Sequence, residues 1–564
     1  MSQHFDRVVD TLVVGSGNGA LTAAITAHDH QGGDVLIVEK ADQLGGTSAI
    51  SGGGIWIPNN HYAKAAGSQD SVAEAKKYLR TTIPADEVSD ELIDTYLEKG
   101  PEMLKYLADN SQVEYISLKM YPDYYAKNEG AREGHRSLEP KPMARSKVKA
   151  WKKMRESHQM MFAGPVSVTQ REAHDFVIGS WKAPFIIIRM MATHFLDFSW
   201  RKEKQKRARR ITCGAAGVGR LLWSVEDRNI PFETEVALKK LITDDAGSVI
   251  GVEAEKAGKP YFIKANKGVI LACGGFEHND VLREENLPKP SSSQFSAGVK
   301  TNTGDGVVAA RDIGAKLGKM NHAWWVTTWQ VPKEKAPRLS VIEKSLPGSV
   351  VVNNQGVRFA NESENYMAFQ HDLFRTHTKE TPNDPAWMIF DRTYREENMV
   401  GPLMKYKQRP DKVLPKRFFT PEFLVMGNTI EELAKNAGID EAQLKETIET
   451  FNGYARTGKD EQFGRGDAAY DRYYGKDLGQ PNPCLGEIKK PPFYAIRSNP
   501  GDFGTGGGMV VNTNSQVLSQ SGEPIKGLYA TGNCTAALLP TYPGPGSTLG
   551  PAMTFGYIAG KHIK

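Results

Sequence analysis

Residues 541–550, TYPGPGSTLG, place one phenol in a backbone of unusual composition. Two prolines and two glycines follow Tyr542 within four residues, so the chain is stiff at the prolines and free at Gly544 and Gly546. The interior of a core strand or helix does not have this composition. The segment instead fixes one phenol and the backbone N–H of a glycine, just before an apolar helix. Such an arrangement indicates a binding or catalytic role.

A second chemical signal is a glycine-rich turn near the N-terminus, in DTLVVGSGNGALTAAITAHDHQGGDVLIVEK. The pattern predicts a strand, a turn, a helix and a second strand. Gly15, Gly17 and Ala20 fit G-x-G-x-x-G/A, and Gly19 is an additional glycine. These positions permit a tight turn, close approach of the backbone to a pyrophosphate, and close packing of helix on strand. The pattern therefore predicts dinucleotide binding.

The predicted second strand ends in an acid, which strengthens this interpretation. Glu39 lies 24 residues after Gly15 and is placed to accept a hydrogen bond from a ribose hydroxyl. The helix N-terminus would direct its free N–H groups at the phosphates. The alternative is a tight strand–helix turn that binds no ligand.

Further glycine-rich strand ends indicate which dinucleotide is bound. A second glycine cluster lies in residues 41–60, a strand ending in Ala-Cys-Gly-Gly in 267–279, and a strand and turn with Gly532 and Asn533 in 526–536. Such widely separated segments predict a discontinuous domain around FAD. A second nucleotide fingerprint for NAD(P)H is absent, so we expect electrons from an organic substrate.

The composition agrees with a large globular enzyme. At 564 residues the chain predicts two or three domains. Its four cysteines are scattered, which indicates neither a metal site nor a disulfide framework, and the N-terminal residues do not have the pattern of a signal peptide. We expect a cytoplasmic protein. The formal net charge is +5, but residues 201–210 alone carry +6, so the rest of the chain carries −1. The positive charge is therefore confined to one segment, and no nucleic-acid partner is indicated.

With these motifs in view, the chain resembles the 3-ketosteroid Δ1-dehydrogenases, a branch of the succinate dehydrogenase/fumarate reductase flavoprotein superfamily. The resemblance covers most of the chain and is carried, in order, by VVGSGNGAL, EKADQLGGTSAISGGGIWIP, YPDYY, RFANESENY, FGRGDAAYDRYYG, PFYAIRSNPGDFGTGGG, GLYATGNCTA and YPGPGSTLGPAMTFGY. One departure is Asn18, where the family often has glycine. It lies inside the turn, and we expect little effect.

The resemblance implies an α/β fold with a discontinuous Rossmann-like FAD-binding domain and an inserted α+β catalytic cap domain. We expect the FAD-binding domain to combine residues 1–125, 210–300 and 500–564. Residues 126–209 would form an insertion, and residues 301–499 the catalytic domain. FAD is expected to be non-covalent. The residues expected to bind it are Gly15, Ser16, Gly17, Asn18, Gly19, Ala20, Glu39, Lys40, Gly46, Thr47, Ser48, Gly52, Gly53, Val236, Ala272, Gly274, Gly532, Asn533 and Leu549.

The family's reaction removes two hydrogens, from C1 and C2 of a 3-ketosteroid, with FAD taking the hydride at N5. By resemblance, the Tyr542 hydroxyl and the Gly546 N–H would form an oxyanion hole for the C3 oxygen. Tyr366 in NESENY would be the base, supported by Tyr124 in YPDYY, and Tyr121 would line the steroid pocket. A phenol has an ordinary pKa of about 10, so we expect activity to rise at alkaline pH.

Three other segments carry weaker expectations. STLGPAMTFGYIAG would begin a helix with Pro551 in its first turn and its positive end toward the flavin. The segment HAWW (322–325) is either pocket wall or core. Residues 428–458 are predicted to form a capped helix pair.

Residues 176–210 are apolar and aromatic and then basic. Arg189, His194 and Asp197 interrupt the apolar run, which makes a transmembrane helix improbable. An apolar segment followed by Lys and Arg suits peripheral contact with the anionic inner face of a cell membrane. Such contact would suit substrates with a side chain, such as cholest-4-en-3-one. The alternative is a lid or subunit contact.

Other reactions on the same scaffold stay open. The first is Δ4-dehydrogenation of 3-oxo-5α-steroids, although YPDYY together with TYPGPG favours Δ1. Fumarate-type reduction is disfavoured, because tyrosines stand where arginine and histidine would bind a dicarboxylate. A non-catalytic flavin-binding membrane subunit is the second rival, and the three tyrosines argue against it. The electron acceptor, a quinone or an artificial dye, and the oligomeric state are not indicated.

Overall fold

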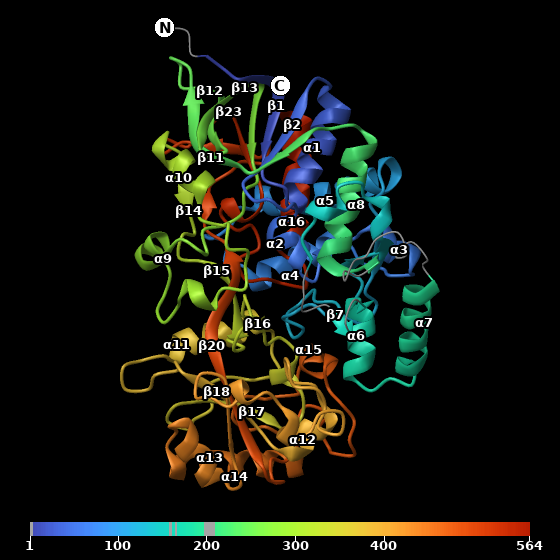
Figure 1. Cartoon of the computed structure of the whole chain (residues 1–564), viewed down its shortest axis with the longest axis vertical. Helices are drawn as coiled ribbons and strands as arrows, with labels where there is room; N and C mark the ends of the chain where they lie inside the picture. The colour runs from blue at the N-terminus through green and yellow to red at the C-terminus, as the bar shows by residue number, and fades with distance from the viewer. Residues whose placement is uncertain (1–3, 157–160, 164–165, 197–208) are drawn as a thin grey trace.

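Two sheets, one largely parallel and one antiparallel, organise the computed structural model, which describes residues 4–156, 161–163, 166–196 and 209–564 (Figure 1). Together with the helices that cover them, they give a mixed α/β fold. Both chain termini lie at the end of the molecule formed by the first sheet, and the second sheet lies at the opposite end (Figure 1).

The first sheet has the strand order β10-β2-β1-β13-β12-β11, with β23 beside β13 and β22 beside β23. β1, β2, β10, β13 and β23 pair in parallel. Their bounds are β1 Arg7–Val14, β2 Val35–Glu39, β10 Phe232–Thr234, β11 Val236–Thr243, β12 Val249–Lys256, β13 Lys259–Leu271, β22 Gln516–Leu518 and β23 Pro524–Ala530. The predicted strands around the glycine turn, in 267–279 and in 526–536 therefore lie side by side.

The side chains of β1 alternate between two hydrophobic clusters, one on each face of the first sheet. Val13 packs with residues of α1 (Asn18–Gln31), α8 (Cys213–Asp227) and α16 (Leu549–His562), whereas Leu12 and Val14 pack on the other face with α10 (Asp305–Asp312). Successive side chains of a strand point to opposite faces, so a strand apolar at every position needs helices on both sides.

Glycines bring α1 and α16 into close contact. A methyl group at Gly19 would lie 2.9 Å from the carbonyl oxygen of Ala552, and one at Gly556 would lie 2.4 Å from that of Gly19. Gly560 is equally close to Ala23, at 2.6 Å. Gly19, the additional glycine of the turn motif, is therefore required by packing between these helices.

The second sheet is antiparallel, with the order β16-β15-β20-β18-β17 and β19 beside β20. Its strands are β15 Ala323–Trp329, β16 Arg338–Leu339, β17 Ser349–Asn353, β18 Ala386–Phe390, β19 Leu424–Gly427 and β20 Phe493–Thr505. α11 (Tyr366–Thr376) packs on one face and α13 (Ile430–Ala437) with α14 (Glu441–Thr457) on the other. The predicted helix pair is confirmed, with side-chain N-caps at Thr429 and Asp440 and glycine C-caps at 438 and 458.

Shorter elements complete the two lobes. Near the first sheet these are α2 Gly46–Ile50, β3 Ile55–Trp56, α3 His61–Ala65, α4 Val72–Thr82, α5 Asp90–Asn110, β4 Tyr115–Ser117, β5 Ser137–Pro140, α9 Asp280–Asn286, β14 Leu317–Gly318 and β21 Gly508–Met509. The second sheet is accompanied by α12 Arg392–Glu397 and α15 Ala469–Tyr473.

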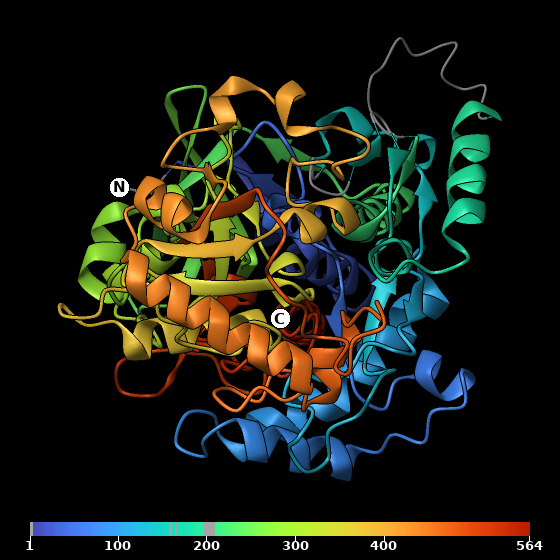
Figure 2. The ribbon, with the colours of Figure 1, turned by 90° about the horizontal axis from the view of Figure 1, so that it is seen from below.

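The insertion is tied at its base and projects from the molecule. β6 (Met143–Ala144) pairs with β9 (Arg210–Ile211), so the chain leaves and returns at one ladder. Between them lie β7 Met161–Ala163, β8 Val166–Ser167, α6 Gln170–Val177 and α7 Ala183–Leu196, and α7 stands at the edge of the molecule (Figure 2). Within the described residues no helix is both long and apolar enough to cross a bilayer. Residues 197–208, with most of the basic run, lie outside them.

The packing divides the chain slightly differently from the predicted domains. The apolar face of α10 joins the core of the first sheet, although residues from 301 onward were assigned to the catalytic domain. β20 spans the predicted boundary at 499/500, and β5 pairs with β3 and β4 beside the first sheet. The division into FAD-binding, inserted and catalytic parts stays a prediction, with boundaries that the packing would move by up to about one element.

Candidate active site

One pocket gathers the functional residues predicted from the sequence. It opens where β1, β2, β13 and β23 end, and all 24 of them line it, including Tyr121, Tyr124, Tyr366, Tyr542 and Gly546. In open parallel sheets the carboxyl ends of the strands form the ligand-binding edge. At one end the lining is glycine-rich, and at the other it is aromatic.

The glycine turn after β1 combines two steric roles. Gly15 has a φ of +113°, and a methyl group there would lie 2.2 Å from the carbonyl oxygen of Ala272 in the segment after β13. At Gly17, in contrast, the nearest atom to such a methyl is the Ser48 hydroxyl, at 3.1 Å. α1 begins at Asn18 without a side-chain cap. Gly15 therefore fits the strands together, while Gly17 leaves an open approach to the positive end of a helix.

Glu39, at the end of β2, is buried and oriented by two hydrogen bonds. The Ser16 hydroxyl donates to Oε2 at 2.5 Å, and the N–H of Ala41 donates to Oε1 at 2.9 Å. Burial nevertheless raises the pKa of Glu39 above its ordinary value. Next to it, Lys40 forms an ion pair with Asp305 at 2.8 Å. The position of Glu39 suits acceptance of a hydrogen bond from a ribose.

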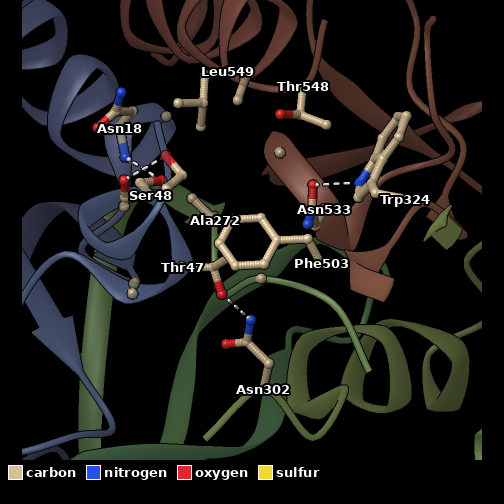
Figure 3. Close-up of a pocket in the computed structure, with 18 of the residues that line it drawn as sticks. Asn18, Thr47, Ser48, Ala272, Asn302, Trp324, Phe503, Asn533, Thr548 and Leu549 are labelled. Carbon is tan, nitrogen blue, oxygen red and sulfur yellow. Dashed lines mark hydrogen bonds between the residues drawn. The ribbon is translucent and has the colours of Figure 1, made fainter. Parts of the chain in front are cut away.

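The second glycine cluster folds over this turn. The Ser48 hydroxyl accepts a hydrogen bond from the N–H of Asn18 at 3.2 Å, which joins the two loops (Figure 3). Thr47 accepts hydrogen bonds from the N–H of Val299 at 3.2 Å and from Nδ2 of Asn302 at 3.3 Å. Gly53 has a φ of +72° and faces the backbone of α8. The loop is therefore fixed from both sides of the pocket.

Three tyrosines from distant segments meet at the other end. The ring centroids of Tyr124 and Tyr366 are 5.6 Å apart, those of Tyr124 and Tyr542 are 5.6 Å apart, and those of Tyr366 and Tyr542 are 5.5 Å apart. Tyr121 lies 6.5 Å from Tyr124 by the same measure. Tyr366 is the first residue of α11, whereas Tyr542 lies in the loop before α16.

Hydrogen bonds to the backbone hold the loop around Tyr542. The N–H of Tyr124 donates to the carbonyl of Pro543 at 2.9 Å, and the Tyr78 hydroxyl donates to the same oxygen at 2.5 Å. The Tyr125 hydroxyl donates to the carbonyl of Thr541 at 2.6 Å. These contacts stabilise Tyr542 at a φ of +59°, in a region that non-glycine residues seldom occupy.

Gly546 is required by geometry. Its φ is +101°, and a methyl group would lie 2.5 Å from the backbone of Gly54. Burial raises the pKa of Tyr542, and hydrogen bonds from the Tyr366 hydroxyl, the Thr548 hydroxyl and the Gly546 amide oppose this increase. The amide of Gly546 therefore lies close to the Tyr542 hydroxyl.

Burial also determines the acidity of the other phenols. The pKa of Tyr366 is raised well above its ordinary value, first by burial and next by Tyr542, while a hydrogen bond with Tyr124 lowers it. The pKa of Tyr124 is likewise raised by burial. A phenol in this cluster ionises only when another donor stabilises its oxygen.

The wall around the tyrosines is apolar. Trp324 lines the pocket and donates from its indole to Asn533 at 3.1 Å (Figure 3). Trp325 is 1% exposed and belongs to the core. HAWW is therefore both wall and core, because successive residues of β15 point to opposite faces. Further apolar residues that line the pocket are Val326, Leu339, Val341 and Phe503, of which Phe503 lies near Ala272, Thr47 and Asn533 (Figure 3). Among the described lining residues, the charged ones are at the glycine-rich end.

Residues 10–549 match the FAD binding domain family. The chain belongs to this family of flavoproteins. The flavoprotein's uncapped α1, open Gly17 and oriented Glu39 fit the pyrophosphate and ribose of FAD, which is its cofactor. No described residue indicates a covalent link, and non-covalent binding stays a prediction.

Relatives and a solved structure agree over nearly the full length. The flavoprotein is 38% identical to a 3-oxosteroid 1-dehydrogenase of Mycobacterium tuberculosis, over 98% of both chains. It is 36% identical to the 4-oxocyclohexanecarboxylate 2-dehydrogenase of Sinomonas cyclohexanicum, over 98% of this chain and 92% of the relative. The crystal structure of 3-ketosteroid Δ1-dehydrogenase from Sterolibacterium denitrificans with 1,4-androstadiene-3,17-dione superposes with a TM-score of 0.94, at 39% identity and 99% coverage of both chains. The flavoprotein is an FAD-dependent oxidoreductase.

Several pocket residues were not predicted from the sequence. Asn302 and Phe503 line the pocket from the segments TNTGDG and NPGDFGTGGG, and Gln170 reaches it from the insertion. The glycines of the first two segments give a signal that could have been used. Gln170 gives none, because the capping box of Thr169 and Glu172 around it predicts only the start of a helix. Its place in the pocket depends on a hydrogen bond of 2.8 Å to the carbonyl of Gly52.

Proposed function

We propose that the flavoprotein catalyses the 1,2-dehydrogenation of 3-ketosteroids, converting 3-oxo-4-enes to 1,4-dien-3-ones. The observation that supports this best is the contact of Tyr124, Tyr366 and Tyr542 beside an apolar wall in the pocket that fits FAD. When bound, FAD supplies a two-electron acceptor for the hydride from C1. The chain's own residues must then bind the ketone and take the proton from C2.

The hydroxyl of Tyr542 and the N–H of Gly546 would bind the C3 oxygen. Both donors are fixed by the surrounding loop before substrate arrives, so little reorganisation is needed as negative charge develops on that oxygen. A stabilised enolate oxygen makes the neighbouring C2–H more acidic. This pair of donors therefore prepares the proton transfer.

Tyr366 would accept the C2 proton as the general base. It projects from the first turn of α11, next to both other tyrosines. Tyr124 stabilises the Tyr366 oxygen by a hydrogen bond, which lowers the pKa of Tyr366 against the effect of burial. The proton passes to the Tyr366 oxygen while the two donors hold the C3 oxygen.

The apolar wall favours an uncharged substrate over a cyclic keto acid. A 4-oxocyclohexanecarboxylate would need a cation for its carboxylate at the tyrosine end, and a buried unpaired charge costs several kcal/mol, about 3–5 when a partner is missing. The described lining offers cations only at the glycine-rich end. A steroid instead buries its rings against this wall.

An anaerobic experiment tests the reaction. Purified holoenzyme is mixed with androst-4-ene-3,17-dione, with a 3-oxo-5α-steroid, and with 4-oxocyclohexanecarboxylate, while flavin absorbance is followed and products are identified. Bleaching by the first with a 1,4-dien-3-one product supports the proposal. Bleaching only by the 5α-steroid would indicate Δ4-dehydrogenation, and bleaching only by the keto acid would indicate the smaller substrate.

We further propose peripheral contact of α7 with an anionic membrane, which would give access to side-chain-bearing substrates such as cholest-4-en-3-one. Ile186 and Met190 pack inward with residues of β8, so the outer face of α7 is left to Phe185, Ile188 and Phe195. Phe185 and Ile188 are 64% and 65% exposed. An exposed apolar face of this kind followed by basic sequence suits a lipid surface.

Cosedimentation with anionic and neutral vesicles tests this contact. Trp181, just before α7, is also exposed. The triple variant Trp181→Ser, Phe185→Ser, Ile188→Ser should lose binding to anionic vesicles and turn over cholest-4-en-3-one more slowly, with androstenedione turnover unchanged. The exposed residues Met120 and Val281 provide a matched control as Met120→Ser, Val281→Ser. Equal vesicle binding by wild type and the triple variant would contradict the proposal.

The electron acceptor, a quinone or a dye, is varied in the turnover assay with cholest-4-en-3-one.

A further inference from the structure

A buried carboxyl group lies behind the pocket and has no part in the mechanism above. Glu277 follows β13 in the segment GGFEHN, and its side chain is fully buried. Its Oε1 accepts a hydrogen bond from Nδ2 of Asn302 at 2.7 Å. Its Oε2 has no hydrogen-bond partner of good geometry among the described residues, although the backbone N–H groups of Glu277 and Thr505 favour the charged carboxylate. A fully buried carboxyl group with so few donors is costly, which indicates a reason to keep it.

Two glycines border the space that this carboxyl group occupies. A methyl group at Gly298 would lie 2.5 Å from Oε1 of Glu277, and one at Gly275 would lie 2.7 Å from Oε2 and 2.3 Å from the Thr505 hydroxyl. Neither glycine has a positive φ, so backbone conformation does not explain them. Their lack of a side chain is used to admit the carboxyl of Glu277.

Asn302 links Glu277 to the pocket. The Asn302 amide that donates to Glu277 also approaches the Thr47 hydroxyl at 3.3 Å, and both Asn302 and Thr47 line the pocket (Figure 3). Thr47 belongs to the second glycine cluster, which was predicted to bind FAD. A change at Glu277 would therefore reach the cofactor through two side chains.

The charged groups around Glu277 leave its carboxyl without a cation. Asp502 of β20 lies nearby, but Arg283 of α9 donates to Asp502 at 2.7 Å and to the backbone carbonyl of Glu277 at 3.1 Å. His278, the next residue, faces the carbonyl of Gly298 at 3.1 Å. No described cation pairs with the Glu277 carboxyl. Burial, and next the charge of Asp502, raise its pKa to about 7, against the hydrogen bond from Asn302.

We propose that Glu277 is a positioning residue of the cofactor site, whose carboxylate holds the Asn302 amide against Thr47 and whose protonation loosens that hold. A hydrogen bond to an ionised acceptor is about twice as strong as one to a neutral acceptor. FAD is therefore held more firmly when Glu277 is ionised. The proposal rests on FAD being the cofactor and not on the steroid reaction.

The test is the FAD dissociation constant of reconstituted protein at about pH 6 and about pH 8.5, on either side of the ordinary neutral range. Wild type should bind FAD about tenfold more tightly at the higher pH. Glu277→Gln, which keeps the shape and removes the charge, should bind at both pH values like wild type at the lower one. The flavin absorption spectrum of wild type should change between these pH values, and that of the variant should not.

Two further variants keep the test decisive. Asn302→Ala leaves Glu277 intact but removes the side chain that links it to the pocket. This variant should therefore also lose the pH dependence of FAD binding, and it tests the proposal if Glu277→Gln does not fold. Glu343→Gln, at a half-buried glutamate near α12 whose pKa burial also raises, should retain the pH dependence. His278 titrates below its ordinary range because burial lowers its pKa, so it does not supply the change. FAD affinity independent of pH in wild type, or tighter at the lower pH, would overturn the proposal.

Discussion

The glycine-rich end and the tyrosine end of the pocket differ in how far apart their residues lie in the chain. Gly15, Gly17 and Glu39 come from one strand–turn–helix–strand unit, in which Glu39 follows Gly15 by 24 residues. Tyr124, Tyr366 and Tyr542 come from three segments separated by more than 170 residues each. Their contact depends on a hydrophobic cluster that joins residues of both lobes.

This difference predicts different responses to substitution. The glycine-rich end is defined by steric fit, so a small added group should disturb binding and stability. The tyrosine end is defined by the position of single oxygen atoms. Removing one oxygen there should reduce the reaction rate while leaving FAD content and folding intact.

The largest effect is expected for Tyr366→Phe. Loss of a general base lowers the rate typically by about 10²- to 10⁴-fold. The measurement is the rate of flavin bleaching by androst-4-ene-3,17-dione without oxygen. Tyr494→Phe, which removes a buried hydroxyl of β20 that contacts Asp411, is the matched control and should keep the rate. A loss of less than tenfold in Tyr366→Phe would assign the base elsewhere.

Tyr542→Phe should have a somewhat smaller effect. Removing one donor of an oxyanion hole costs about 10²- to 10³-fold in rate, because the amide of Gly546 still donates. The same single-turnover assay measures it, and FAD content should stay at the wild-type level. Gly546→Ala is the informative partner, since its methyl would meet the backbone of Gly54. It should lower thermal stability as well, whereas Tyr542→Phe should not.

The two ends also differ in how well they could be predicted from the sequence. At the glycine-rich end the βαβ unit, the position of Glu39 and the neighbouring strands were predicted from spacing, because local geometry determines them. The helix pair at 428–458 was predicted from caps for the same reason. In these segments the residues that specify the structure are neighbours in the chain.

At the tyrosine end, spacing alone could not bring the residues together. Each tyrosine in isolation reads as a packed core residue, and only resemblance to a family grouped Tyr124, Tyr366 and Tyr542. The positive φ of Tyr542 depends on carbonyl contacts with Tyr78 and Tyr125, which are far away in the chain. The link from Glu277 to Thr47 through Asn302 was missed for the same reason.

The pH dependence of flavin reduction should differ between wild type and Tyr366→Phe. Burial holds the pKa of Tyr366 above its ordinary value, and the base acts only when deprotonated. Below that pKa the ionised fraction, and with it the rate, should rise by about tenfold per pH unit. Stopped-flow measurements from neutral to alkaline pH test this. The profile of Tyr366→Phe should be flat, and a flat wild-type profile with chemistry rate-limiting would contradict the role of the phenol.

The smallest effects are expected at the glycine-rich end, where Gly15→Ala and Gly17→Ala separate packing from binding. A methyl at Gly15 meets the carbonyl of Ala272 at 2.2 Å and adds strain at a positive φ, so Gly15→Ala should reduce the free energy of unfolding by about 1–3 kcal/mol. At Gly17 the methyl meets only the Ser48 hydroxyl, at 3.1 Å, which can rotate. Gly17→Ala should therefore keep apoprotein stability within about 1 kcal/mol and weaken FAD binding instead. Thermal unfolding of the apoprotein and FAD titration measure the two quantities. Equal losses of the free energy of unfolding would mean that both glycines are needed for packing. FAD would then not depend on the space beside Gly17.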